Sequence, residues 1–171
     1  MSEQLPPYIL GKSSERIALY GLEEFRVNAL CLAQQAQQSL HIISPDLESP
    51  IYGDSEFYEA VKSLVIGNRH AAVRLLVNHT DKAINYGHRL VELVQRFSSF
   101  MELRRLAEEH SDFNQAFLIA DGRGLLHRPH ADRYEGECCY DAPREARLLN
   151  ETFNNLWPHA SRDPALLSLH I

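Results

Sequence analysis

The sequence lacks long apolar runs, an even set of cysteines and an excess of positive charge. No apolar stretch approaches the roughly 20 residues that a transmembrane helix needs, so no membrane association is expected. The three cysteines are an odd number and two are adjacent, which makes a poor disulfide framework. The formal net charge of -6 argues against broad, non-specific binding to nucleic acids. Since no basic segment followed by an apolar one opens the chain, no secretory signal is expected and a cytoplasmic location is predicted.

The residues that are present have the composition of one folded domain. Of the 171 residues, 44% are hydrophobic and 23% are charged, which favours a packed core over disorder. Residues 1–13 contain two prolines and no hydrophobic periodicity, and we expect them to form a flexible N-terminal arm. We therefore predict one α/β domain over residues 14–160, followed by a C-terminal tail over residues 161–171.

The hydrophobic pattern predicts strands that alternate with helices. Apolar side chains that recur at three- and four-residue steps predict helices over residues 22–38, 56–64, 81–97 and 143–157. Short runs of β-prone residues predict strands over residues 40–43, 72–77, 100–104, 116–120 and 125–128. The early alternation favours parallel pairing, and the Asp-Gly-Arg-Gly turn at 121–124 favours an antiparallel hairpin near the end. The predicted fold is a mixed, mostly parallel sheet flanked by helices.

Residues 114–121 read Asn-Gln-Ala-Phe-Leu-Ile-Ala-Asp. In this segment and in its order of elements, the chain resembles the phospholipase D-like superfamily, whose motif is H-x-K-x4-D. Asn114 stands in the histidine place, Ala116 in the lysine place, and Asp121 is retained. The chain is also similar to a bacterial family of uncharacterised domains of this type. The resemblance implies a single phospholipase D-like domain.

The two replaced positions lack the chemistry of that motif. The superfamily cleaves phosphodiesters through a covalent phospho-histidine. Residues i and i+2 of a strand project from the same face, so histidine and lysine can converge on one phosphate. Asn114 cannot accept a phosphoryl group at nitrogen as imidazole does, and Ala116 carries no charge. We expect no catalytic residue in this degenerate motif, and no cofactor or metal. Asp121, which precedes a glycine, is interpreted as a turn residue.

Basic side chains follow the degenerate motif directly. The set comprises Arg123, His127, Arg128, His130 and Arg133, with Tyr134 beside them. Such a cluster could hold a phosphate, a nucleotide or an acidic partner, and His127, Arg128 and Arg133 are the ligand-binding candidates within it. The alternative is a solvated loop whose arginines pair with the acidic residues at 132, 135, 137 and 141.

A second group of candidates lies at the ends of the first two predicted strands. Ser44 and Asp46 follow the first strand, and His79 follows the second. The carboxyl ends of parallel strands meet at one edge of a sheet, where ligands bind in open α/β folds, so these side chains could line a pocket. The alternative is that the same residues cap helices and form turns.

Three functions remain open from the sequence. The first is a catalytically inactive phospholipase D-like binding or regulatory module that recognises a phosphate-bearing ligand or a protein partner. The second is a hydrolase or phosphotransferase with a non-standard site that uses His79, Asp46 or His127. The third is a structural protein-interaction domain. Single-motif members of the superfamily usually place two copies face to face, so the resemblance also implies a homodimer.

Overall fold

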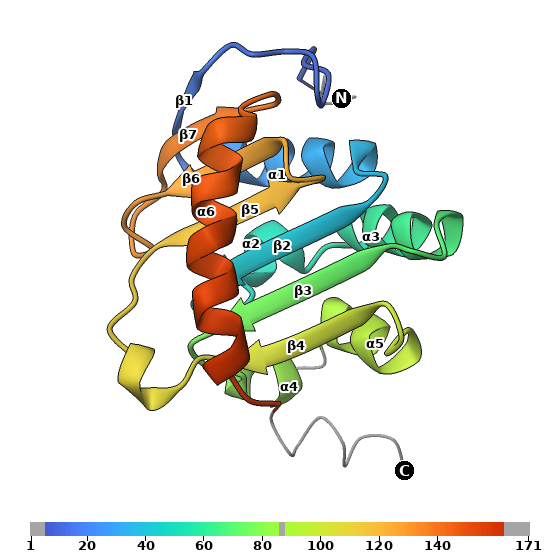
Figure 1. The fold of residues 1–171 in the computed structure, drawn as a ribbon, viewed down its shortest axis with the longest axis vertical. Coiled ribbons are helices and arrows are strands. Elements are labelled where there is room, and N and C mark those ends of the chain that lie inside the picture. The colour runs from blue at the N-terminus through green and yellow to red at the C-terminus, as the bar shows by residue number, and fades with distance from the viewer. Residues whose placement is uncertain (1–5, 86–87, 163–171) are drawn as a thin grey trace.

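The computed structural model describes residues 6–85 and 88–162 and contains, in that part of the chain, one sheet of seven strands (Figure 1). Their spatial order is β1-β7-β6-β5-β2-β3-β4. The strands are β1 (Ile17–Tyr20), β2 (Ser39–Ser44), β3 (Ala72–Val77), β4 (Met101–Arg105), β5 (Ala116–Ala120), β6 (Gly124–Arg128) and β7 (Glu135–Cys139).

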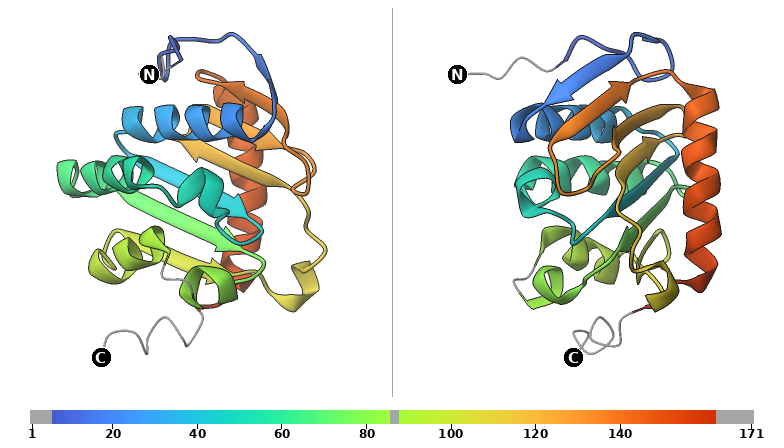
Figure 2. Two further views of the ribbon diagram at one scale, coloured as in Figure 1. Left: turned by 180° about the vertical axis from the view of Figure 1, so that it is seen from behind. Right: turned by 90° about the vertical axis from the view of Figure 1, so that its left-hand side faces the viewer.

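Helices cover both faces of this sheet, and the two faces are covered differently (Figure 2). One face carries α1 (Leu22–Gln35), α2 (Ser49–Tyr52), α3 (Ser55–Gly67), α4 (Asp81–Asn85) and α5 (Arg89–Arg96). The long helix α6 (Pro143–Leu156) crosses the opposite face, and two 3-10 turns lie at Glu108–His110 and Trp157–His159. The result is a three-layer α/β/α domain.

The prediction of a mostly parallel sheet is wrong. Among the described strands, β2 pairs parallel with β3, and β3 pairs parallel with β4. The other four pairings, β1 with β7, β2 with β5, β5 with β6 and β6 with β7, are antiparallel. Crossover helices join the parallel strands, whereas a tight turn joins β5 to β6, and β5 itself returns antiparallel to β2.

The hydrophobic pattern did not predict two of the strands, β1 and β7, or the break between helices α4 and α5. In β1 only Leu19 is buried, and β7 begins with exposed and half-buried residues, so neither strand has a clear apolar alternation. The helix predicted over residues 81–97 is two helices, α4 and α5, because the His88 side chain accepts a hydrogen bond from Leu90 N and caps α5. A histidine is not a typical capping residue.

The predicted arm and tail are described only in part. Within residues 6–13, the Tyr8 ring stacks on Tyr140 at 5.4 Å between centroids, and Gly11 N donates to Tyr140 O at 2.8 Å. Residues 163–171 lie outside the described part, whereas Arg162 pairs with Glu102 at 3.0 Å. The division at residues 13 and 161 stays a prediction.

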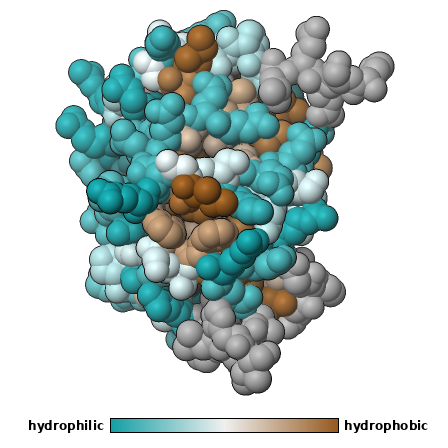
Figure 3. All heavy atoms as spheres, turned by 90° about the vertical axis from the view of Figure 1, so that its right-hand side faces the viewer, coloured by the Kyte–Doolittle hydropathy of each residue, from teal (hydrophilic) through white to brown (hydrophobic). Residues whose placement is uncertain are grey.

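The core has a layer on each side of the sheet. Alternate residues of a strand point to opposite faces, so Ile42 of β2 packs towards α1 and α3 and its neighbour Ile43 packs towards α6. All five residues of β5 are buried. One side of the surface is mostly hydrophilic, with small separate apolar patches (Figure 3). In the described residues, no helix is long and apolar enough to cross a membrane.

Asp121 fastens the turn between β5 and β6 to the connection between α1 and β2. Its backbone is in the left-handed region, with a φ of 54°. Its carboxylate accepts hydrogen bonds from the backbone N–H groups of Gln37, Gln38 and Ser39 at 2.8–3.1 Å. The carboxylate therefore satisfies three backbone donors between α1 and β2.

Replacing Asp121 by alanine is expected to lower the free energy of unfolding by about 2 kcal/mol, because charge-assisted hydrogen bonds are lost and a left-handed backbone is kept. Chemical denaturation followed by circular dichroism measures the change. The matched Asp112→Ala variant, at an exposed position, should lie within about 0.5 kcal/mol of the parent. Equal stabilities of the two variants would contradict the role of Asp121.

Candidate functional site

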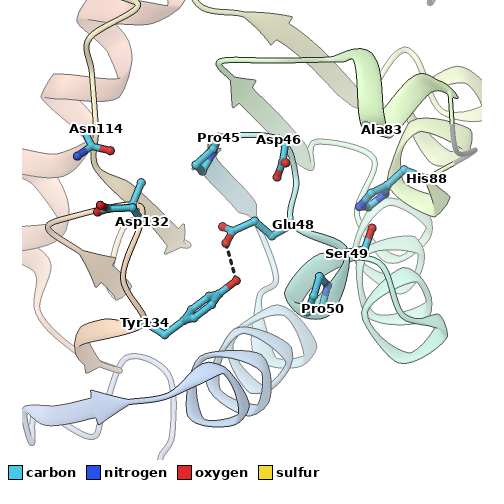
Figure 4. Close-up of a pocket in the computed structure, with 11 residues that line it drawn as sticks. Pro45, Asp46, Glu48, Ser49, Pro50, Ala83, His88, Asn114, Asp132 and Tyr134 are labelled. Atoms are coloured by element: carbon cyan, nitrogen blue, oxygen red, sulfur yellow. Dashed lines mark hydrogen bonds between the residues drawn. The ribbon is translucent and has the colours of Figure 1, made fainter.

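A hollow of about 610 Å³ lies at the edge of the sheet where β2 and β6 end and β5 begins. The segment after β2, the start of α5, the residues before β5 and the β6–β7 connection all contribute to its wall. The polar side chains that line it are Asp46, Glu48, Ser49, His88, Asn114, Asp132 and Tyr134. In Figure 4, Glu48 lies near the centre, with Asp132 and Asn114 on one side and His88 on the other.

The Glu48 carboxylate accepts three side-chain hydrogen bonds. Its Oε1 accepts from Arg128 Nη2 at 2.6 Å and from Ser44 Oγ at 3.3 Å. Its Oε2 accepts from the hydroxyl of Tyr134 at 2.9 Å. The Glu48 side chain is 14% exposed and the Arg128 side chain 3%, so this is a buried ion pair at the base of the hollow.

Arg128 is held from several sides. Besides Glu48, its Nη2 donates to Ala131 O at 2.9 Å, and its guanidinium lies 4.9 Å from the centre of the Tyr134 ring. Among the described residues, the Nε of Arg128 has no hydrogen-bond partner. Arginine keeps its charge in proteins, so this group is a permanent buried cation.

The backbone before Glu48 is held in an unusual conformation. Leu47 has a φ of 58°, a region that a leucine rarely adopts. Its N–H donates to Ser44 Oγ at 3.1 Å, its carbonyl oxygen accepts from His88 Nε2 at 2.7 Å, and its side chain is fully buried. These contacts fix the direction in which Glu48 leaves the chain.

His88 links this loop to α5. Its Nδ1 accepts from Leu90 N at 3.0 Å while its Nε2 donates to Leu47 O. Burial lowers the pKa of His88 below its usual 6.5, although the Leu47 carbonyl and the charge of Asp46 act in the opposite direction. A neutral ring with its proton on Nε2 satisfies both bonds.

The electrostatic character of the hollow is acidic. Asp46, Glu48 and Asp132 line it, and no lysine or arginine does so in the described part of the chain. Burial raises the pKa of Tyr134, and its bond to Glu48 raises it further, so the phenol stays protonated and donates at neutral pH. Arg128, which does not line the hollow itself, is already paired with Glu48.

The three positions of the predicted motif lie in different surroundings. Asn114 is exposed and lines the hollow, whereas Ala116 is buried at the start of β5. Asp121 lies at the other end of β5, about 17 Å away along a strand of five residues. It therefore binds the backbone near Gln37 and does not reach the hollow.

The structure brings some predicted ligand-binding residues together and separates others. Ser44, Asp46 and Arg128 all lie at or beneath the hollow. His79 is exposed and does not line the hollow, although its N–H bonds Pro45 O at 2.9 Å. Arg133 is exposed and does not line it either.

His127 lies on the opposite face of β6 from its neighbour Arg128. It bonds Gln115 Oε1 at 2.9 Å beside Phe117, and burial lowers its pKa. The predicted basic cluster is therefore dispersed, and His79, Asp46 and His127 do not form one site. The interpretation of the arginines as surface ion pairs fits Arg123, which pairs with Asp141 at 3.0 Å.

Glu48, His88 and Asp132 were not predicted as site residues. The spacing of Asp46 and Glu48 after the end of a strand is the one local signal for Glu48. Nothing in the sequence links Glu48 to Arg128, which is 80 positions further along. In the described residues, no group of three or more His, Cys, Asp or Glu side chains is arranged to hold a metal ion.

Comparisons with known proteins give a family and a fold. A family model described as "Domain of unknown function (DUF7931)" matches residues 21–169. No curated protein matches the chain. Solved structures that are similar include TrmBL2, an archaeal chromatin protein described as showing a novel mode of DNA binding. It is 15% identical with a TM-score of 0.64, and the match covers 86% of this chain and 54% of TrmBL2.

Two further similar structures support the phospholipase D-like fold. NucT from Helicobacter pylori is 13% identical with a TM-score of 0.59, and the match covers 87% of this chain and 99% of NucT. Phosphatidylserine synthase from Haemophilus influenzae Rd KW20 is 16% identical with a TM-score of 0.59, and the match covers 92% of this chain and 41% of the synthase. This chain thus spans about half the length of TrmBL2 and less of the synthase. At these identities the likeness concerns the fold alone.

The stability of the protein is expected to fall as the pH drops below 6.5. The pKa of folded His88 is lowered, so the unfolded chain takes up a proton that the folded chain resists. His41 and His127, whose pKa values burial also lowers, contribute with the same sign. Denaturation at a series of pH values should show that the free energy of unfolding falls less steeply with acidification in His88→Asn than in the parent. Asparagine can cap the helix but does not titrate in this range.

The His79→Asn variant controls for the loss of one imidazole at an exposed position. A loss on acidification that is as steep in His88→Asn as in the parent protein would contradict the role of His88.

Proposed function

Since this chain belongs to the family described as a domain of unknown function (DUF7931), we propose its function from its geometry. The chain is a phospholipase D-like domain that binds a ligand in the hollow at the strand ends and does not cleave phosphodiesters. The observation that carries this proposal is the pairing of Arg128 with Glu48 beneath a wall that presents Asn114 to the hollow.

The chemistry of the wall supports binding without hydrolysis. Covalent phosphoryl transfer needs a nucleophile that a neighbouring group activates and a cation that stabilises the developing charge. Asn114 provides no such nucleophile, and the guanidinium of Arg128 is engaged by a carboxylate.

The ligand expected from the sequence carries a phosphate, and it remains part of the proposal with Arg128 as its cation. A protein partner and a homodimer remain proposals that rest on the resemblance. DNA binding, which TrmBL2 is described as showing, gains no support from a chain with a net charge of -6.

The purified protein should give no turnover of bis(p-nitrophenyl) phosphate above the background of the Asn114→Ala variant. The reason is that neither protein has a group that can take up the phosphoryl moiety. The absorbance of released p-nitrophenolate over a range of pH measures the turnover, and Asp132→Asn is a second matched variant. Turnover that purifies with the protein and disappears in Asn114→Ala would overturn the absence of catalysis.

Binding in the hollow is expected to appear as thermal stabilisation in a screen of phosphate esters, nucleotides and amines. A ligand at 100 times its dissociation constant adds about 2.7 kcal/mol of stability. Asn114→Trp, which places a large ring in the mouth of the hollow, should abolish the stabilisation. Glu151→Trp, on the exposed side of α6, should retain it. A ligand whose effect survives Asn114→Trp binds elsewhere and contradicts the assignment.

A further inference from the structure

Arg128 faces Ala116 across the β5–β6 pairing. The two residues line the same small cavity, together with Phe25 and Tyr52. The guanidinium carbon of Arg128 lies 5.9 Å from the centre of the Phe25 ring, so the arginine extends below the hollow on the face of Ala116. A long side chain at position 116 would compete for this space, and the methyl group of alanine leaves it to the arginine.

The guanidinium of Arg128 is only partly satisfied by protein groups. Its Nη2 serves both Glu48 and the carbonyl of Ala131, whereas its Nε has no partner among the described residues. A buried donor without an acceptor is costly and uncommon in folded proteins. The side chain is 3% exposed, so bulk water does not compensate. A buried cation with donor capacity to spare is suited to bind an oxyanion.

Glu48 is bonded as a bound oxyanion would be. A guanidinium, a phenol and a hydroxyl converge on its two carboxylate oxygens, from Arg128, Tyr134 and Ser44. Glu48 lines the hollow, whereas Arg128, to which it is bonded, does not. An anion that enters from the hollow meets Arg128 only where Glu48 now is.

We propose that Arg128, Tyr134 and Ser44 form an oxyanion site in which the Glu48 carboxylate is an internal ligand that masks the site. The external ligand carries a phosphate or a similar oxyanion and has to displace Glu48. This inference rests on the proposed function only in taking the hollow as the route of entry. It assigns the ligand class and the residue that regulates access.

The internal carboxylate makes free phosphate a poor ligand of the unaltered protein. A tethered group competes at a high effective concentration, and Asp46 and Asp132 add repulsion. The Glu48→Gln substitution keeps the size of the side chain and removes its negative charge. It weakens the hold on Arg128 and opens the same three donors to an anion in solution.

Isothermal titration with inorganic phosphate, and separately with dimethyl phosphate, tests the proposal on four proteins. They are the parent, Glu48→Gln, Asp132→Asn and the double variant Glu48→Gln/Arg128→Met. Glu48→Gln should bind at least one of the anions about tenfold more tightly than the parent, a difference of about 1.4 kcal/mol. Asp132→Asn removes the same charge from the same hollow without a contact to Arg128 and should gain much less. The double variant should lose the gain.

Three results would overturn the masked site. They are no gain for either anion in Glu48→Gln, an equal gain in Asp132→Asn, or a gain that survives the loss of Arg128. If Glu48→Gln folds poorly, its melting temperature with and without phosphate replaces the titration, and a missing Arg128-dependent rise counts against the proposal. Phosphodiester turnover would contradict the proposed function without changing the outcome of the phosphate titrations. Failure of the proposed function and failure of the masked site can therefore be told apart.

Discussion

The ion pair between Arg128 and Glu48 is the constraint on which the site depends. An arginine that is 3% exposed needs a counter-charge, because desolvation of an unpaired charge costs more than folding can supply. Glu48 meets that need from the β2–α2 connection, and its direction is fixed by the left-handed backbone of Leu47. Removal of one partner of such a pair costs about 3–5 kcal/mol, more than the pair itself contributes. The β6 end and the β2 end are thus tied together at the floor of the hollow.

The parts of the fold that the sequence predicts are those with a strong local pattern. The helices near 22–38 and 143–157 and the strands at 72–77 and 116–120 appear within a few residues of the expected bounds. Strand direction is different, because the pairing of β5 with β2 brings together residues about 80 positions apart. The hydrophobic periodicity of a strand predicts which of its residues are buried. It does not predict which other strand pairs with it.

In the candidate site too, some residues were predicted from local sequence and others depend on contacts between distant segments. Asn114 lies at the hollow, and Asp46 and Ser44 lie at the end of β2 where polar residues were expected. The basic cluster fails as one site because neighbouring residues of a strand face opposite ways, which sends His127 towards α6 and Arg128 inward. The role of Glu48 depends on a contact with β6 that no spacing in the sequence reveals.

The domain has a phospholipase D-like fold, and Asn114 lies at the hollow at its strand ends while Ala116 is buried in β5. The charge beneath the hollow comes from Arg128 on β6, opposite Ala116, and a carboxylate of the same chain holds it. The most direct test is a crystal structure of the Glu48→Gln variant grown with phosphate. The account predicts a phosphate within hydrogen-bond distance of the Arg128 guanidinium and the Tyr134 hydroxyl. An Arg128 that keeps its bonds to the introduced amide and to Ala131, with no anion beside it at saturating phosphate, would contradict the account.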